Sequence, residues 1–200
     1  GGQAGCISIN NKSMISRANY ILDKGTNRRK FLNNIKKKII SPNNKGFYSW
    51  VDLGSEYRAP ELTSALVYSQ ILKSKKIQTK RKIIWEKYEK IIDSLKTNKF
   101  YLIKPLKNTT SAHHIVALIF KNLKISNKLK HIMQKNKIAA TFHYVPLHKS
   151  KMGRKFCKYK LPITENIYNK VVRLPLFSEM TDVQFKKISS ILKKFTDKNS

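Results

Sequence analysis

Apolar residues recur at helical spacing along much of the chain and predict five helical stretches. These stretches are residues 11–24, 60–95, 126–136, 164–172 and a final one that begins at Thr181. Residues 60–95 are long enough for one long helix or two in series. In the first part of that stretch, one face is formed by Leu62, Ala65, Leu66, Ser69 and Ile71. The residues expected to face inward are Leu129, Ile132 and Met133 in the 126–136 helix, and Phe185, Ile188, Ile191, Leu192 and Phe195 in the last helix.

Residues that commonly begin or end helices stand at several of these predicted helix boundaries. Gly25 follows the first helix, where a glycine commonly ends one, and Pro60 suits the first turn of the second. Ser126 is expected to cap the helix that it opens. Thr181 and Gln184 have the spacing of a capping box, so the last helix begins there.

Short runs rich in β-branched and aromatic residues predict strands over residues 6–10, 100–103, 115–120 and 138–142. From residue 96 onward the predicted order is strand, strand, helix, strand, helix, helix, which is typical of an α+β module. Residues 26–50 are polar and irregular, and their aromatic side chains indicate a segment that docks on another surface.

The composition permits a folded protein with a sizeable core. Hydrophobic residues make up 40% of the chain and aromatic residues 10%, which is unlike a disordered sequence. The best apolar run, residues 114–120, has the length of a strand and is too short to span a membrane. Cys6 and Cys157 lie far apart, which favours two reduced thiols in a cytosolic protein over a disulfide or a zinc site.

Charge is the strongest compositional signal, with 42 Lys+Arg against 11 Asp+Glu and a formal net charge of +31. One interpretation is a nucleic-acid or anionic-surface binder. The excess is nearly all lysine and is spread along the chain together with abundant Asn and Ile. That pattern fits biased codon usage better, because nucleic-acid interfaces favour arginine. We therefore expect no specific nucleic-acid partner and only salt-sensitive binding to polyanions.

Few residues stand out as chemical groups when the chain is taken by itself. His143 and His148 flank Pro146 at the end of a predicted strand, a common position for functional side chains. A histidine at a strand end also commonly does no more than bond to the backbone. A metal site would want a third ligand with matching spacing, and the sequence offers none. It also has no glycine-rich phosphate-binding motif and no nucleophile elbow.

Six longer strings carry more specific information when they are taken in order. They are GGQAGCISIN (1–10), KGTNR (24–28), WVDLGSEYRAPELTSALVYSQIL (50–72), SAHHI (111–115), FHYVPLH (142–148) and VVRLPLF (171–177). Together they resemble the sugar-nucleotide aminotransferases of the DegT/DnrJ/EryC1/StrS family. KGTNR and FHYVPLH are similar to the branch that transaminates dTDP-4-oxo-6-deoxyglucose, yielding dTDP-4-amino-4,6-dideoxygalactose for bacterial surface polysaccharide.

The resemblance implies an α/β fold, namely the carboxyl-terminal portion of a transferase of fold type I that depends on pyridoxal 5′-phosphate (PLP). Residues 1–95 would form the end of the large PLP-binding domain with a long connecting helix, and residues 96–200 the small α+β domain. The family's reaction moves an amino group from glutamate to the 4-keto carbon of a dTDP-4-keto-6-deoxyhexose. The resemblance further implies a cytoplasmic enzyme that is a homodimer at full length, with no membrane partner.

The resemblance also implies which residues serve the cofactor. The family's Schiff-base lysine lies a few residues before the position that matches Gly1. We therefore expect no catalytic residue within these 200 residues and no activity from them alone. Ser55, Tyr57 and Arg58 match a loop that reaches the cofactor phosphate. Glu56 stands where many relatives carry a serine or an amide, and its charge opposes a phosphate. Arg58 either compensates for that charge or is a solvated loop residue.

On the substrate side, the resemblance implies that Asn27, Arg28, His143, Tyr144 and His148 bind the sugar nucleotide. Two alternatives stay open beside the aminotransferase. One is an inactive relic of such an enzyme, in keeping with Glu56 and the drifted charge. The other is a lysine-rich nucleic-acid-binding module.

Overall fold

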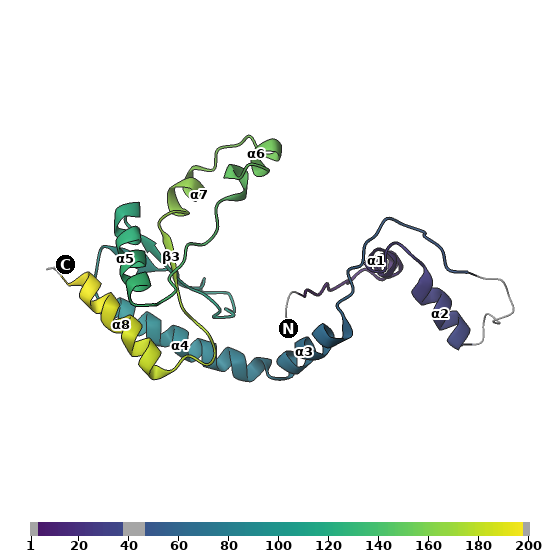
Figure 1. Cartoon of the computed structure of the whole chain (residues 1–200), viewed down its shortest axis with the longest axis horizontal. Coiled ribbons are helices and arrows are strands. Elements are labelled where there is room, and N and C mark those ends of the chain that lie inside the picture. The colour runs from purple at the N-terminus through teal and green to yellow at the C-terminus, as the bar shows by residue number, and fades with distance from the viewer. Residues whose placement is uncertain (1–3, 38–46, 198–200) are drawn as a thin grey trace. The chain divides into compact units, whose positions relative to one another are not determined.

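A computed structural model describes residues 4–37 and 47–197 (Figure 1). The chain divides into two compact units, Gly1–Lys73 and Ser74–Ser200. The second half of the predicted 60–95 helix belongs to the second unit. The predicted boundary at residue 95 concerns the complete transferase fold and stays a prediction.

The described residues of the first unit form a short 3₁₀ turn and three α-helices. Their bounds are Lys12–Met14 (η1), Ile15–Leu22 (α1), Arg28–Lys36 (α2) and Glu61–Leu72 (α3). The predicted helix within residues 11–24 is confirmed, and Gly25 follows it with a φ of 76°. Lys24 also takes a positive φ of 57°, so the chain reverses over two residues. The N–H of Gly25 then donates to the carbonyl of Tyr20 at 2.7 Å.

Two predictions for the first unit are wrong. Residues 6–10 form no strand, because no segment within the described ranges pairs with them, and their side chains are mostly exposed. Residues 28–36 form helix α2, where the sequence indicated irregular structure. Its few apolar residues stand among lysines, arginines and asparagines, so the helical period is hard to see. The rest of the predicted loop, 38–46, lies outside the described residues.

Helix α3 is apolar around its circumference but is not covered by the first unit. Leu62, Leu66 and Ile71, which the helical spacing places on one face, are exposed by 82%, 57% and 60%. Of the two alternatives left open for residues 60–95, the structure has two helices in series, since α3 ends at Leu72 and the next helix begins at Ser74.

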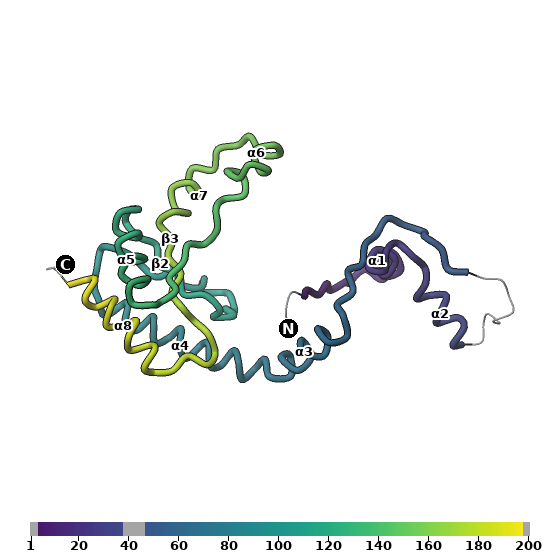
Figure 2. The backbone as a smooth tube through the Cα atoms, viewed as in Figure 1, coloured from purple at the N-terminus to yellow at the C-terminus, as the bar shows by residue number. Residues whose placement is uncertain are grey.

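The second unit contains the remaining helices and all three strands of the described chain. Their bounds are Ser74–Ser94 (α4), Phe100–Leu102 (β1), Val116–Phe120 (β2), Leu123–Lys135 (α5), Leu147–Lys149 (η2), Gly153–Phe156 (α6), Pro162–Ile167 (α7), Val171–Leu174 (β3) and Asp182–Thr196 (α8). Between β2 and β3 the chain leaves the sheet, makes the α6–α7 segment and returns (Figure 2).

The three strands form one antiparallel sheet in the order β1-β2-β3. Phe100 pairs with Phe120, and Val116 pairs with Leu174. Alternate residues face a core that is closed by α4, α5 and α8, as the alternating burial of β2 requires. Arg173 interrupts the buried positions of β3 and pairs with Ala117, so both lie on the opposite face of the sheet.

The core of this unit is continuous and rich in aromatic residues. Phe100, Phe120 and Phe195 have ring centroids 5.1–6.4 Å apart. Tyr88 and Leu129 are fully buried on the facing helices. Each large apolar side chain buried in this way contributes about 1.5–3 kcal/mol. The inward faces predicted for the last two long helices are largely confirmed, with Leu129, Met133, Ile188, Ile191, Leu192 and Phe195 buried.

The ends of the elements in this unit are partly as predicted. The capping box of Thr181 and Gln184 is present at the start of α8. The cap of α5 is Asn122, whose Oδ1 accepts from the N–H of Ile125 at 3.0 Å. Ser126, predicted to be that cap, lies one turn inside the helix, where its hydroxyl donates to the carbonyl of Leu123.

Two further predictions for this unit are wrong. Residues 138–142 make only one isolated bridge, between Thr141 and Arg173. The predicted 164–172 helix ends at Ile167, and β3 begins at Val171. The valines of β3 pair with β2 instead, Val171 with Ile119 and Val172 with Leu118. The order is therefore strand, strand, helix, helix, strand, helix, with α6 also preceding α7.

Within the described residues, no helix combines the length and the apolar character that crossing a membrane would need.

Candidate functional site

The loop that carries the predicted cofactor residues is bound to the end of helix α1. The carbonyl of Gly25 accepts from the N–H groups of Val51 and Asp52 at 2.8 and 3.1 Å. The N–H of Ser55 donates to the carbonyl of Ile21, and the carbonyl of Ser55 accepts from the N–H of Lys24, each at 3.1 Å. We call this contact between residues 21–26 and 50–58 the glycine junction.

Two glycines make the close approach at the glycine junction possible. A Cβ atom added to Gly25 would overlap the carbonyl of Asp52, and one added to Gly54 would overlap backbone atoms of Gly25 and Ile21. Gly25 also has a positive φ, which disfavours other residues. The loop and the helix end therefore approach at backbone distance, which a side chain at either glycine would prevent.

Two ion pairs connect the two sides of the glycine junction, and a third joins its loop to Arg17 on α1. Arg17 pairs with Asp52 at 2.8 Å and Lys24 with Glu56 at 2.6 Å. The hydrogen bond from Arg17 lowers the pKa of Asp52, and the hydrogen bond from Lys24 lowers the pKa of Glu56. The remaining pair joins Arg58 to Asp23.

No local pattern singles out Asp23, yet it is one of the few buried polar or charged residues of the described chain. Its Oδ2 accepts from the Arg58 guanidinium at 2.7 Å. Its backbone carbonyl accepts from the hydroxyl of Thr26, which is also buried. Arg58 is thus held by a fixed carboxylate while 42% of its side chain remains exposed. It is neither a free loop charge nor fully enclosed.

The predicted cofactor residues have the donors that a phosphate group needs. Ser55 and Tyr57 carry hydroxyl groups, and the Tyr57 ring is exposed. Only one nitrogen of Arg58 bonds to Asp23, so the guanidinium retains other N–H donors. Glu56 would repel a phosphate, but Lys24 neutralises it. The residues present fit a phosphate-bearing group on these grounds.

The predicted substrate residues of the first unit are engaged locally. Asn27 lies just before α2, where its side-chain oxygen accepts from the N–H of Ser49 at 2.8 Å. The guanidinium of Arg28 lies over the Tyr48 ring, 5.9 Å from its centroid. Asn27 thus holds the loop in place, and the charge of Arg28 is available on an aromatic platform.

The predicted histidines of the second unit have separate partners. His148 is almost buried, and its Nε2 lies 3.2 Å from Oε1 of Glu165. Glu165 also accepts from the N–H of Leu161 and from Lys149. These bonds, that from Leu161 first and then those from Lys149 and His148, lower the pKa of Glu165. His148 therefore ties η2 to α7, a structural role that the strand-end pattern could not separate from substrate binding.

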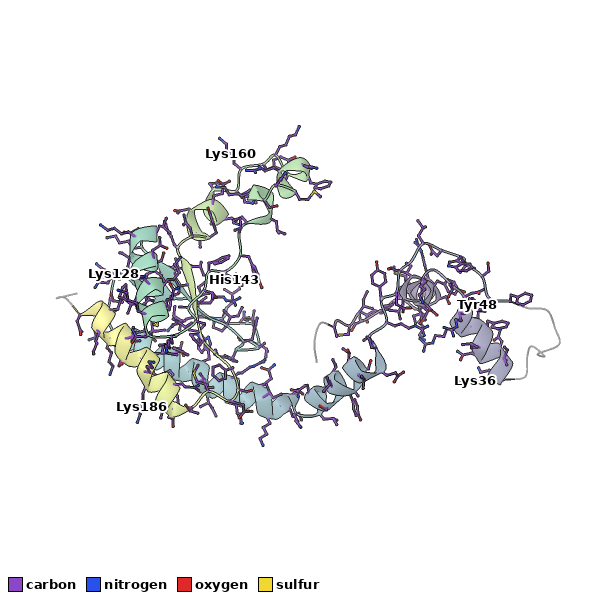
Figure 3. The ribbon with its side chains drawn as sticks, viewed as in Figure 1. Lys36, Tyr48, Lys128, His143, Lys160 and Lys186 are labelled. Carbon is purple, nitrogen blue, oxygen red and sulfur yellow. The ribbon has the colours of Figure 1, made fainter. Side chains whose placement is uncertain are left out.

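His143 belongs to a different cluster beside the sheet (Figure 3). Its Nδ1 lies 3.2 Å from the guanidinium of Arg173. The same guanidinium lies over the ring of Tyr144, 6.0 Å from its centroid. Sequence reasoning did not select Arg173. The available signal was a single arginine within an otherwise apolar β-branched run at 171–174.

Other candidate chemistry is sparse in the described part of the chain. Cys6 and Cys157 are both free thiols. Residues 4–37 and 47–197 contain no group of three His, Cys, Asp or Glu side chains that could hold a metal ion.

A family model described as the DegT/DnrJ/EryC1/StrS aminotransferase family matches residues 1–193. The chain belongs to this family.

Individual relatives agree with the assignment. A curated relative, the uncharacterized protein MJ1066 of Methanocaldococcus jannaschii, is 24% identical over 207 residues, covering 99% of this chain and 51% of that protein. Among solved structures, PseC of Helicobacter pylori, an aminotransferase of pseudoaminic acid biosynthesis, has a TM-score of 0.75 at 18% identity. That match covers 94% of this chain and 47% of PseC.

Spr1654 of Streptococcus pneumoniae, described as a sugar aminotransferase and solved in its PLP form, is also similar. Its TM-score is 0.75 at 15% identity, covering 94% of this chain and 44% of Spr1654. These similarities establish that this DegT-family chain has the aminotransferase fold, of mixed α/β class. The chain spans about half the length of the relatives it matches.

Proposed function

We propose that this chain supplies the carboxyl-terminal part of a PLP-dependent sugar-nucleotide aminotransferase. The reaction would move an amino group from glutamate to the 4-keto carbon of a dTDP-4-keto-6-deoxyhexose. The observation that carries the proposal is the family match over residues 1–193. The strings KGTNR and FHYVPLH support the choice of acceptor.

We propose PLP as the cofactor, with support from the family match and from the PLP form of Spr1654. When bound, PLP supplies the electron sink that amino transfer requires. Ser55, Tyr57 and Arg58 would hold its phosphate, and Asp23 would orient Arg58. Lys24 keeps Glu56 from opposing that phosphate.

The remaining parts of the proposal follow from the same resemblance. The amino donor is glutamate, the complete enzyme is a homodimer, and it acts in the cytoplasm. Arg28, His143 and Tyr144 would contact the sugar nucleotide. His148 would act through the loop that it fixes with Glu165.

The test uses the full open reading frame that encodes Gly1–Ser200. We expect a Ser/His-x-x-Lys motif in frame shortly before Gly1. The purified product should convert dTDP-4-keto-6-deoxyglucose and glutamate into an amino sugar nucleotide, detected by mass spectrometry, with 2-oxoglutarate released. A stop codon in place of that motif would instead support the inactive relic. An intact frame whose product transfers no amino group to a 4-keto sugar nucleotide would contradict the proposed reaction.

A further inference from the structure

The α6–α7 segment, residues 147–167, projects from the sheet of the second unit (Figure 2). Most of its large apolar side chains are in solvent. Five of them are exposed by 61–84%, namely Met152, Ile163, Tyr159, Phe156 and Leu147. Single exposed apolar residues are common on protein surfaces, but several gathered in one short stretch mark a site that contacts a protein or a membrane.

The backbone of the α6–α7 segment has a defined conformation. The hydroxyl of Ser150 donates to the carbonyl of Leu147 at 2.7 Å and accepts from the N–H of Gly153 at 2.9 Å. A Cβ atom added to Gly153 would overlap the carbonyl of Leu147, so η2 and α6 approach at backbone distance. His148 and Glu165 join η2 to α7. The segment is therefore folded, and its fold leaves the apolar side chains outside.

The same segment is strongly basic. It carries six cations, five of them lysine, at positions Lys149, Lys151, Arg154, Lys155, Lys158 and Lys160. Its one acid, Glu165, is already engaged by His148 and Lys149. Lys160 lies on the outer part of the segment, away from the sheet (Figure 3). Basic clusters that bind anionic lipids have about 4–8 lysines and arginines, and this segment falls within that range.

The combination of charge and exposed apolar surface limits what the segment binds. The exposed apolar helix α3 lacks this combination, because residues 61–72 contain no lysine or arginine. A second copy of the segment is disfavoured as the occupant, since both surfaces would be basic. Nucleic acid would satisfy the charge. The aliphatic side chains of Leu147, Met152 and Ile163 gain nothing from base stacking, however, whereas a lipid surface buries aliphatic and aromatic groups alike.

We propose that the α6–α7 segment binds the surface of an anionic lipid bilayer. Its lysines and Arg154 contact lipid phosphates, which brings the segment to the surface. Phe156 and its apolar neighbours then enter the boundary between headgroups and acyl chains, which holds it there. The resemblance implies no membrane partner, so this contact goes beyond the proposed function, and it leaves the proposed reaction unchanged.

The test mixes the protein made from the full reading frame with lipid vesicles and separates bound from free protein by flotation. Vesicles of phosphatidylglycerol mixed with phosphatidylcholine should bind the protein, and vesicles of phosphatidylcholine alone should not. Phe156→Ser should weaken binding to the anionic vesicles about tenfold or more, because it removes an inserted ring. The matched control is Phe47→Ser, at a ring exposed by 85% against 83% for Phe156. This control lies outside the segment and should bind within about twofold of the original protein.

A second pair of variants tests the charge. Lys155→Gln combined with Lys158→Gln should weaken binding to the anionic vesicles about tenfold or more, because both ammonium groups lie near the lipid surface. The matched control combines Lys124→Gln with Lys128→Gln, which removes the same charge from exposed positions on α5. Charges farther from the surface are screened by salt, so this control should bind within about twofold of the original protein.

A measurement on the original protein does not depend on whether any variant folds. Trypsin cuts after lysine and arginine. The anionic vesicles should slow its cuts within residues 149–160 more than its cut after Lys107, which lies in an exposed turn. Equal slowing at both places would contradict a contact made by the α6–α7 segment.

Four further results would overturn the proposal. One is the absence of binding to the anionic vesicles. Another is equal weakening by the two lysine pairs, which would mean attraction to the net charge alone. A third is unchanged binding of Phe156→Ser, which would mean adsorption without insertion. The fourth is displacement from the vesicles by single-stranded RNA together with an equal loss of RNA affinity in Phe156→Ser, which would assign the segment to nucleic acid.

Discussion

The guanidinium of Arg58 donates a hydrogen bond of 2.7 Å to the carboxylate of Asp23, which is buried at the end of helix α1. The two residues are 35 positions apart in the chain. Their contact places a cofactor-binding candidate on a fixed support. It also gives the glycine junction an ion pair whose acid is shielded from water.

Neutralising Asp23 should loosen the glycine junction. Asp23→Asn removes a charge-assisted bond worth about 2 kcal/mol. Exchange of the Val51 and Asp52 amides, which donate to Gly25, should therefore become about 30-fold faster. Arg58→Gln should have a larger effect, because it leaves a buried carboxylate without its cation. Glu179→Gln, which removes an exposed pair with Lys80, is the control and should leave this exchange unchanged.

Alanine at Gly54 should disrupt the same junction by steric overlap. The added Cβ meets backbone atoms of Gly25 and Ile21, which cannot rotate away as a side chain would. We expect limited proteolysis to cut residues 50–58 faster in Gly54→Ala. Gly5→Ala is the matched control, since nothing lies within 4 Å of its added Cβ. Equal protection in both variants would show that the loop does not approach α1 as described.

Loss of the Tyr88 hydroxyl should destabilise the second unit. The hydroxyl of this buried residue donates to the carbonyl of Pro175 at 2.8 Å. Tyr88→Phe leaves that carbonyl without its donor and should lower the free energy of unfolding in urea by about 1–2 kcal/mol. Tyr101→Phe, at an exposed position on β1, should change it by less than about 0.5 kcal/mol. Similar values for the two variants would contradict the buried bond.

Tyr88 should also make the second unit sensitive to alkali. Burial raises the pKa of its phenol above the ordinary value of 10.0. The unfolded chain therefore loses this proton at lower pH than the folded chain does. The stabilisation that the folded state gains from the protonated phenol is fully present below about pH 10. It declines as pH rises toward the raised pKa. Urea midpoints between pH 9 and 11 should fall less steeply in Tyr88→Phe than in the original chain, with lysine titration common to both.

At acid pH the α6–α7 segment should lose its hydrogen bonds before the core unfolds. The N–H of Leu161, followed by Lys149 and His148, lowers the pKa of Glu165 below 4.5. The Glu165 carboxylate stabilises this segment above pH 4.5, and this stabilisation is lost as pH falls through the lowered pKa. Exchange of the Leu161 amide should accelerate in that range. Glu165→Ala, which removes the acceptor of the Leu161 N–H, should show fast exchange already at neutral pH, and protection of Leu161 in that variant would contradict this arrangement.

The sequence by itself determined the family, the helices of strong period and the inward faces of α5 and α8. Local signals suffice for these features, because a helix shows its buried face every three to four residues and a capping box is set by residues three apart. The strings KGTNR and FHYVPLH drew attention to two of the regions where candidate groups gather. They could not show which side chains are already engaged.

Only the tertiary structure decided the features that depend on partners distant in the chain. Residues 6–10 and Val171–Leu174 both have strand-like composition, but only the second run pairs with a strand among residues 4–37 and 47–197. His143 and His148 look equivalent in sequence, yet one bonds to Arg173 and the other to Glu165. Asp23 gave no local signal, and Arg173 gave only that of a single arginine in an apolar run, because burial and the absence of a carboxylate are properties of the assembled surroundings. Pairing, burial and charge compensation arise between distant segments, and a local pattern cannot contain them.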